Sequence, residues 1–131
     1  MEVGVYGWGV GHENFDALAS LLERLHARGW VLWVYDRMLG TLYSQFGYTP
    51  EFARPYSYRE ELPNDLDFLL SIGGDGTILD AAQYILGSNV PIVGINFGHL
   101  GFLSSLQAAT LEHLEETLES GYYSIERFPT A

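Results

Sequence analysis

Apolar residues in this chain occur either in short continuous runs or at helical spacing. Residues 3–8 and 30–35 are almost wholly apolar, a pattern typical of strands that are buried on both faces of a parallel sheet. Between them, leucines at i, i+3, i+4 and i+7 over residues 18–25 predict an amphipathic helix. Asn14 is placed to cap this helix, and Gly29 is placed to end it. The first third of the sequence therefore predicts a strand, a helix and a second strand.

The same alternation returns further along the chain. Residues 66–72 and 90–95 predict strands, and residues 77–86 predict the helix between them. Thr110 is placed to cap a last helix, and residues 122–128 predict a final strand. Residues 36–64 predict a short helix and an irregular crossover. Their aromatic side chains are expected to pack under a long loop, and the less favoured alternative is a platform for a ligand. The fold class expected is α/β, an open, mostly parallel, Rossmann-like sheet with helices on both faces.

Composition narrows the function classes. The 131 residues are 47% hydrophobic and carry a net charge of −11, with no cysteine and no lysine, since all six basic residues are arginine. This excludes a Walker-type phosphate loop, a Schiff-base lysine, disulfides and cysteine-ligated zinc. An acidic surface lacks the basic footprint of a nucleic-acid binder. No apolar run is long enough to span a bilayer, so we expect a cytoplasmic protein with neither nucleic-acid nor membrane partners.

A glycine-rich turn joins one predicted strand to the next helix. Gly73, Gly74 and Gly76 surround Asp75, and Thr77 opens the predicted helix. Without Cβ atoms the backbone approaches a ligand closely, and the free N–H groups of a helix start point at it, as in phosphate sites. The alternative interpretation is that the glycines only permit a tight connection, since Asp-Gly is an ordinary turn dipeptide.

Asp75 is the exception in this turn. A carboxylate among N–H donors repels phosphate unless a metal bridges the two or the carboxylate has another task. Its type and position therefore indicate a proton acceptor or a partner of Mg²⁺.

A second glycine-rich segment, GINFGHLGFL at residues 94–103, follows the next predicted strand. Carboxyl ends of neighbouring parallel strands line one crevice, so the two loops are expected to face a common site. Together they resemble the NAD kinase family. The GGDGT motif at 73–77 is shared with diacylglycerol and sphingosine kinases and, more loosely, with phosphofructokinases. The 94–103 segment is the specific one, because lipid kinases lack it.

The resemblance implies a function and a domain arrangement. Residues 1–131 are expected to be the N-terminal α/β nucleotide-binding domain, with the C-terminal β-rich domain of the family absent from this chain and activity of the chain alone doubtful. The reaction implied transfers the terminal phosphoryl group of ATP or polyphosphate to the adenosine 2′-hydroxyl of NAD, giving NADP. The cofactor expected is Mg²⁺, or another divalent metal, with ATP. The family commonly forms homo-oligomers.

Residue roles follow from matched positions. Asp75 is expected to accept the proton of the 2′-hydroxyl, and no residue is assigned as a metal ligand. Phosphate binding is expected from Gly73, Gly74, Gly76 and Thr77. NAD binding is expected from His99, Leu100, Gly101, Phe102 and Leu103. The competing interpretation of Phe102 and Leu103 is that they are core residues, and that of His99 is that it is a solvated loop residue.

The charges around these loops depart from what anionic ligands need. No Lys or Arg occurs between Arg59 and Arg127, so Mg²⁺, the second domain or a neighbouring subunit is expected to compensate. Asn64 and Asp65 copy the letters of a dinucleotide-binding pair of the family, but they precede GGDGT and are rejected as a chance match. Two alternative functions stay open, a lipid kinase and a non-catalytic nucleotide-binding or assembly domain.

Overall fold

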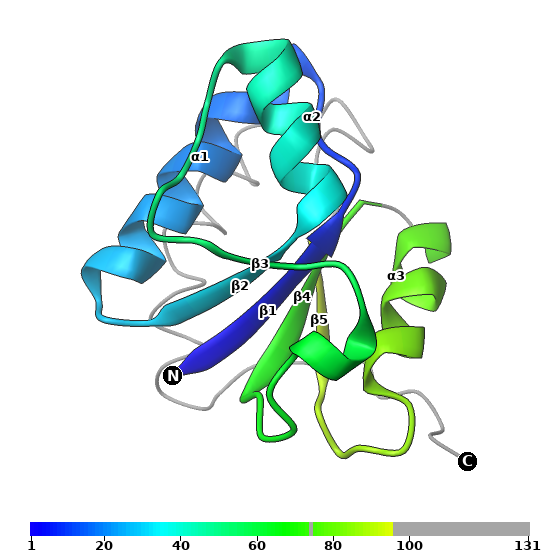
Figure 1. Cartoon of the computed structure of the whole chain (residues 1–131). Coiled ribbons are helices and arrows are strands. Elements are labelled where there is room, and N and C mark those ends of the chain that lie inside the picture. The colour runs from blue at the N-terminus through cyan, green and yellow to red at the C-terminus, as the bar shows by residue number, and fades with distance from the viewer. Residues whose placement is uncertain (74, 96–131) are drawn as a thin grey trace.

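A computed structural model describes residues 1–73 and 75–95, with Asp75 placed by its backbone (Figure 1). Five strands form one sheet in the order β3-β2-β1-β4-β5, and every neighbouring pair is parallel. The strands are β1 (Glu2–Gly7), β2 (Val31–Tyr35), β3 (Arg54–Tyr56), β4 (Phe68–Ile72) and β5 (Ile92–Ile95). The predicted open parallel sheet is confirmed. The helix and strand expected after residue 109 lie outside the described residues.

Helices occupy both faces of this sheet, as predicted. They are α1 (His12–Ala27), α2 (Asp36–Phe46) and α3 (Asp75–Ala82), with the short 3₁₀ turns η1 (Arg59–Glu61) and η2 (Gln83–Ile85). Figure 1 shows α1 and α2 on one side of the sheet and α3 on the other. The chain builds outward from β1 to β2 and β3, crosses back to β4, and then builds outward to β5. The strand order therefore reverses between β1 and β4.

Several element boundaries differ from those predicted. Asn14 does not cap α1, which begins at His12 with Gly11 in the N-cap position, and the Asn14 N–H donates to the Gly11 carbonyl at 3.1 Å. The predicted end at Gly29 is confirmed, since its φ is +85° and its N–H donates to the carbonyl of His26. The helix after GGDGT begins at Asp75, two residues earlier than expected, and its last turn tightens into η2.

Strand β3 is absent from the sequence prediction. It has only three residues and contains Pro55, which lacks a backbone N–H donor. Proline in a sheet is confined to edges and bulges, and β3 is one of the two edge strands of the described sheet. The tyrosines of residues 36–64 differ in exposure. Tyr56 is buried as predicted, whereas Tyr43 and Tyr58 are exposed.

The two faces of the sheet have different chemistry. Along β1, Val3 and Val5 share a face with Gly7, whose ideal Cβ position lies 3.5 Å from Met38 Sδ of α2. This face, under α1 and α2, is the aliphatic face. Buried side chains of the two helices pack there: Leu18, Leu21, Leu22, Leu25, Met38 and Leu42. The opposite face carries Tyr6, Tyr35 and Tyr56 on three neighbouring strands and is the tyrosine face.

Candidate functional site

The carboxyl edge of the sheet brings β1 and β4 together where the strand order reverses. Gly7 is in register with Ile72, and a Cβ on Gly7 would lie 2.7 Å from the Ile72 carbonyl oxygen. This close backbone approach requires glycine at position 7. Open α/β sheets bind ligands at such a reversal, outside the carboxyl ends of the strands. Residues 8–11 follow β1 and Gly73 follows β4 at this point.

Contacts within the protein fix the conformation of Gly73. Its φ of +144° disfavours any side chain, and the Thr77 hydroxyl lies in the space that a Cβ would occupy. Its N–H donates to the Ile95 carbonyl at 2.9 Å, which ties the turn to the end of β5. The structure thus brings Gly73 and Thr77 together, and a structural requirement alone explains the glycine at 73.

Gly76 differs from Gly73. A Cβ at position 76 would meet no non-neighbouring atom within 4 Å, and the residue is exposed in the first turn of α3. The first four N–H groups of a helix have no intrahelical acceptor, and the helix dipole makes this end positive. An anion can therefore approach the backbone at Gly76 without displacing protein atoms.

The remaining expected site residues are placed only in part. The backbone of Asp75 forms the start of α3, next to Gly76. Gly74 and the five residues expected to bind NAD, His99 to Leu103, lie outside the described residues. Their roles stay predictions from the sequence.

Arg37 supplies a positive charge that the sequence analysis missed. It lies in the first turn of α2, and its guanidinium carbon stands 5.5 Å from the ring centroid of Trp8, in the loop after β1. Burial, followed by Asp80 and Tyr35, raises the pKa of Tyr6, whereas the charge of Arg37 lowers it. Arg37 is thus within electrostatic reach of the edge where β1 ends. Its position two residues after a predicted strand was the available signal.

A tyrosine cluster lies just below this edge. The ring of Tyr84, from η2, is 5.1 Å from that of Tyr6, 5.7 Å from that of Tyr35 and 5.6 Å from that of Tyr56. The Tyr56 hydroxyl donates to the Val5 carbonyl at 3.0 Å. Burial is the main cause that raises the pKa of Tyr84, and a side-chain hydrogen bond with Tyr35 adds to it. The pKa values of Tyr56 and Tyr84 are both raised, chiefly by burial, so these two hydroxyls stay protonated at neutral pH.

Asn64 and Asp65, the pair rejected as a dinucleotide-binding match, lie at the opposite edge of the sheet from Gly73. Both residues precede β4, whereas Gly73 follows it, so they border the amino edge of the sheet. They line a pocket there of about 570 Å³ with residues of the 86–91 segment. Among residues 1–73 and 75–95, no helix is long and apolar enough to cross a membrane.

Comparison with known proteins decides the family. Residues 14–123 match the family model of the ATP-NAD kinase N-terminal domain. The chain belongs to this family. It is 37% identical over 123 residues to the NAD kinase of Christiangramia forsetii, covering 93% of the chain and 42% of that protein. It is 28% identical over 128 residues to the NAD kinase of Flavobacterium johnsoniae, covering 97% and 43% of the two.

A solved structure supports the fold of this family member. The crystal structure of yeast NADH kinase complexed with NADH matches with a TM-score of 0.66 and 19% identity, over 93% of this chain and 38% of that one. At this identity the likeness establishes the fold alone. The chain spans about two-fifths of the length of the two curated relatives, so the activity of a whole protein belongs to the proposals below.

Proposed function

We propose that the protein to which this chain belongs is an NAD kinase, which transfers the terminal phosphoryl group of ATP or of inorganic polyphosphate to the adenosine 2′-hydroxyl of NAD. The observation that carries the proposal is the family match over residues 14–123, because it spans both the 73–77 turn and the 94–103 segment. The second of these segments favours NAD over a lipid substrate.

The proposed reaction is a direct phosphoryl transfer. The oxygen of the 2′-hydroxyl attacks the terminal phosphorus, a new P–O bond forms, and the bond from that phosphorus to its bridging oxygen breaks. The hydroxyl proton passes to the carboxylate of Asp75, and ADP, or a shortened polyphosphate, leaves. Because little covalent chemistry falls to the protein in a loose transition state, its contribution is positioning and charge stabilisation.

The start of α3 has the properties that this reaction needs. Gly76 leaves open space beside unpaired N–H groups, and the Thr77 hydroxyl lies against Gly73. The backbone N–H groups at the helix start and the Thr77 hydroxyl would donate to phosphate oxygens, with Gly74 as the adjoining residue of the motif. Asp75 begins the helix between these donors, which suits a base that acts beside the transferred group.

Mg²⁺ fits this site as a partner of the phosphates. Among residues 1–73 and 75–95 there is no group of three or more acidic or histidine side chains that could hold a metal. Magnesium characteristically keeps several waters and binds through one or two carboxylates plus substrate phosphates. Asp75 is the carboxylate that would share it, and the ion would neutralise phosphate charge.

The proposal extends to residues and features that the structure does not test. His99, Leu100, Gly101, Phe102 and Leu103 would line the NAD pocket. The 131 residues would form the N-terminal nucleotide-binding domain, and the β-rich domain of the family would complete the site. A homo-oligomer in the cytoplasm is the expected setting.

The decisive experiment measures NADP formation by the protein encoded by the reading frame that carries this sequence. Asp75→Asn should lower kcat at least about a hundredfold, which is the lower range for loss of a general base. Asp16→Asn, on the exposed surface of α1, is the matched control and should retain wild-type turnover. Undiminished turnover in Asp75→Asn would remove that residue from its role. Phosphorylation of diacylglycerol or sphingosine in place of NAD would favour the lipid-kinase alternative.

A further inference from the structure

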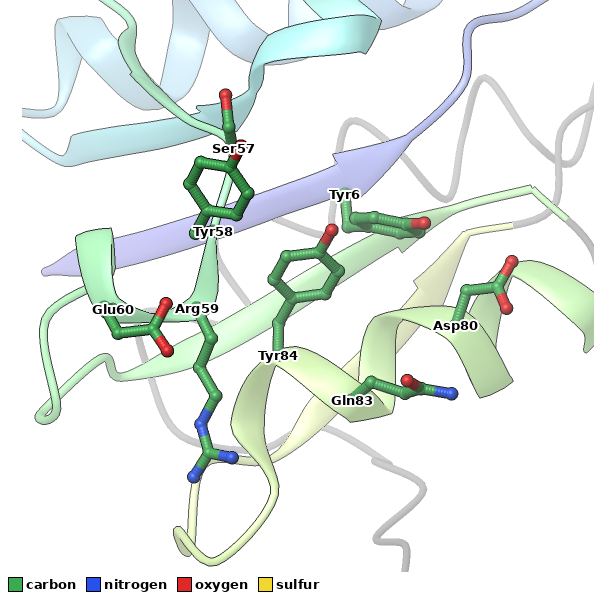
Figure 2. A pocket seen from close by; sticks show the side chains of 8 residues that line it. All are labelled: Tyr6, Ser57, Tyr58, Arg59, Glu60, Asp80, Gln83 and Tyr84. Carbon is green, nitrogen blue, oxygen red and sulfur yellow. The ribbon is translucent and has the colours of Figure 1, made fainter.

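A pocket of about 330 Å³ opens on the tyrosine face, between η1 and η2. Figure 2 shows residues 57–60 on one side of it, residues of α3 and η2 on the other, and Tyr6 of β1 between them. One wall thus consists of four consecutive residues, Ser57 to Glu60, and the facing wall includes Tyr84. Residues 57–61, which contain this first wall, are called the strap below.

The strap lies between two buried side chains but buries little of its own. Tyr56 before it is 1% exposed, and Leu62 after it is 7% exposed. Ser57 is half-buried, and residues 58–61 are all exposed. Segments with few buried apolar contacts open locally at a much lower free-energy cost than the core. The strap can therefore open while Tyr56 and Leu62 keep their places.

Hydrogen bonds within the strap keep it folded in the closed position. The Glu61 carboxylate accepts from the N–H groups of Ser57 and Tyr58, at 2.8 and 2.9 Å. The Glu61 N–H donates to the Tyr58 carbonyl at 3.0 Å, and the Leu62 N–H donates to the Arg59 carbonyl at 3.1 Å. These bonds join residues close in sequence and leave open what holds the strap against the opposite wall.

Two side-chain hydrogen bonds fasten the strap to the rest of the protein. The Ser57 hydroxyl donates to the Asp36 carboxylate at 3.3 Å, at the start of α2. The Arg59 guanidinium donates to the carbonyl of Leu86, the residue after η2. Only the second bond joins the two walls of the pocket, and charge-assisted hydrogen bonds are the stronger class. In Figure 2 the Arg59 side chain extends away from Tyr6, as expected of a fastening outside the pocket.

The wall that faces the strap is held independently of it. The ring of Tyr84 lies 5.1 Å from that of Tyr6, 5.7 Å from that of Tyr35 and 5.6 Å from that of Tyr56. None of these three residues belongs to the strap. Opening of the strap therefore uncovers a wall that is already formed.

We propose that the strap is a gate to this pocket, which opens locally to admit a small molecule, and that the bond from Arg59 to the Leu86 carbonyl sets how often it opens. The pocket volume lies within the usual range for small-molecule sites. The gate does not depend on the proposed kinase function, because it is defined by contacts between the two walls.

Amide hydrogen exchange on the protein that carries this chain tests the gate. The variant is Arg59→Met, which keeps the length of the side chain and removes its donors. The matched control is Arg54→Met, because Arg54 is also exposed and has its guanidinium carbon 5.4 Å from the Trp33 ring centroid, outside the strap. The reporters are the N–H groups of Glu61 and Leu62, which are bonded within the closed strap.

Arg59→Met should speed exchange at both reporters about fivefold or more, as expected for loss of a charge-assisted hydrogen bond. Exchange in β1 should stay at the wild-type rate, and Arg54→Met should leave the reporters unchanged. Unchanged reporter exchange in Arg59→Met would overturn the proposal. An equal rise in β1 would also overturn it, because Arg59 would then stabilise the whole fold.

Nitration of tyrosine rings by tetranitromethane, mapped by mass spectrometry, measures access to the pocket. Tyr84 is half-buried in the pocket wall, and Tyr43, which is 66% exposed on α2, is the internal reference. Arg59→Met should raise nitration of Tyr84 relative to Tyr43, whereas Arg54→Met should not. Faster exchange in the strap with an unchanged nitration ratio would show that opening does not uncover the pocket, and the gate would be refuted.

Discussion

The two faces of the sheet carry different side chains on the same strands, one aliphatic and one rich in tyrosine. On the aliphatic face, the leucines of α1 and Met38 and Leu42 of α2 are fully or almost fully buried against β1 and β2. On the tyrosine face, the neighbouring positions carry Tyr6, Tyr35 and Tyr56, and a pocket lies beside them. Alternate residues of a strand point to opposite faces, so one short strand such as β1 serves both.

This difference separates stability from ligand binding. Aliphatic side chains contribute to stability by leaving water, and they carry no hydrogen-bonding group. Tyrosine buries a large ring and keeps a hydroxyl, and Tyr56 uses its hydroxyl on the Val5 carbonyl at 3.0 Å. The tyrosine face thus retains polar groups next to the edge where phosphate is expected. Substitutions on the two faces should affect different measurements.

The largest effect on stability is expected on the aliphatic face. Leu22 is fully buried in α1, and Leu22→Ala removes buried methyl groups and leaves a cavity. The free energy of unfolding should fall by about 2–5 kcal/mol, as measured by urea denaturation followed by circular dichroism. Under conditions in which the variant is folded, its KM for ATP should equal that of the wild type. A changed KM would mean that the two faces are not independent.

The sequence was sufficient to predict most of the aliphatic face and the sheet. The leucine spacing of residues 18–25 fits one face of one helix, and the short apolar runs of β1, β2, β4 and β5 are typical of buried strands. Those signals are local and periodic, so they can be recognised without knowledge of the tertiary structure. β3 gave no such signal, because three residues with a proline show no period.

A pair of substitutions distinguishes the two glycines Gly73 and Gly76, on the α3 side of the sheet. Gly73→Ala should lower stability by about 1–3 kcal/mol, because φ is +144° and the Thr77 side chain fills the space for a Cβ. Gly76→Ala meets no such atom and should keep or raise stability by up to about 1 kcal/mol, since alanine is the better helix former. Urea denaturation measures both changes.

The same pair tests the phosphate turn. If phosphate oxygens approach the backbone at Gly76, the added methyl group of the stable Gly76→Ala variant should raise KM for the phosphoryl donor and lower kcat for NADP formation. Wild-type kinetics in Gly76→Ala would show that this glycine is not needed for a ligand. The two glycines have the same letter in the sequence, and only their surroundings separate a structural role from a binding role.

The rest of the candidate site depends on contacts that are distant in the sequence. Arg37 reaches the edge of β1 because α2 begins where β2 ends. Tyr58 and Tyr84 line one pocket because the crossover after β3 passes beside η2. A search for cations near GGDGT along the chain cannot find Arg37. The strand-to-helix turn that contains Gly73 and Thr77 was predicted because such a turn is a local structure, whereas the phosphate-binding role of the two residues stays a prediction.

The smallest effect is expected at Ser71 of β4, which belongs to the tyrosine face through its register with Tyr6. Its side chain is fully buried, and its hydroxyl has no hydrogen-bond partner among the described residues. A buried hydroxyl without a partner carries a desolvation cost that alanine avoids. Ser71→Ala should therefore leave the free energy of unfolding unchanged or raise it by up to about 1 kcal/mol, in the same urea assay. Ser71→Val is the steric control, because β4 and α3 pack closely there and added methyl groups should destabilise by about 1–3 kcal/mol. A loss of more than about 1 kcal/mol in Ser71→Ala would instead identify a polar partner for this hydroxyl, and the tyrosine face would then contain a buried polar network.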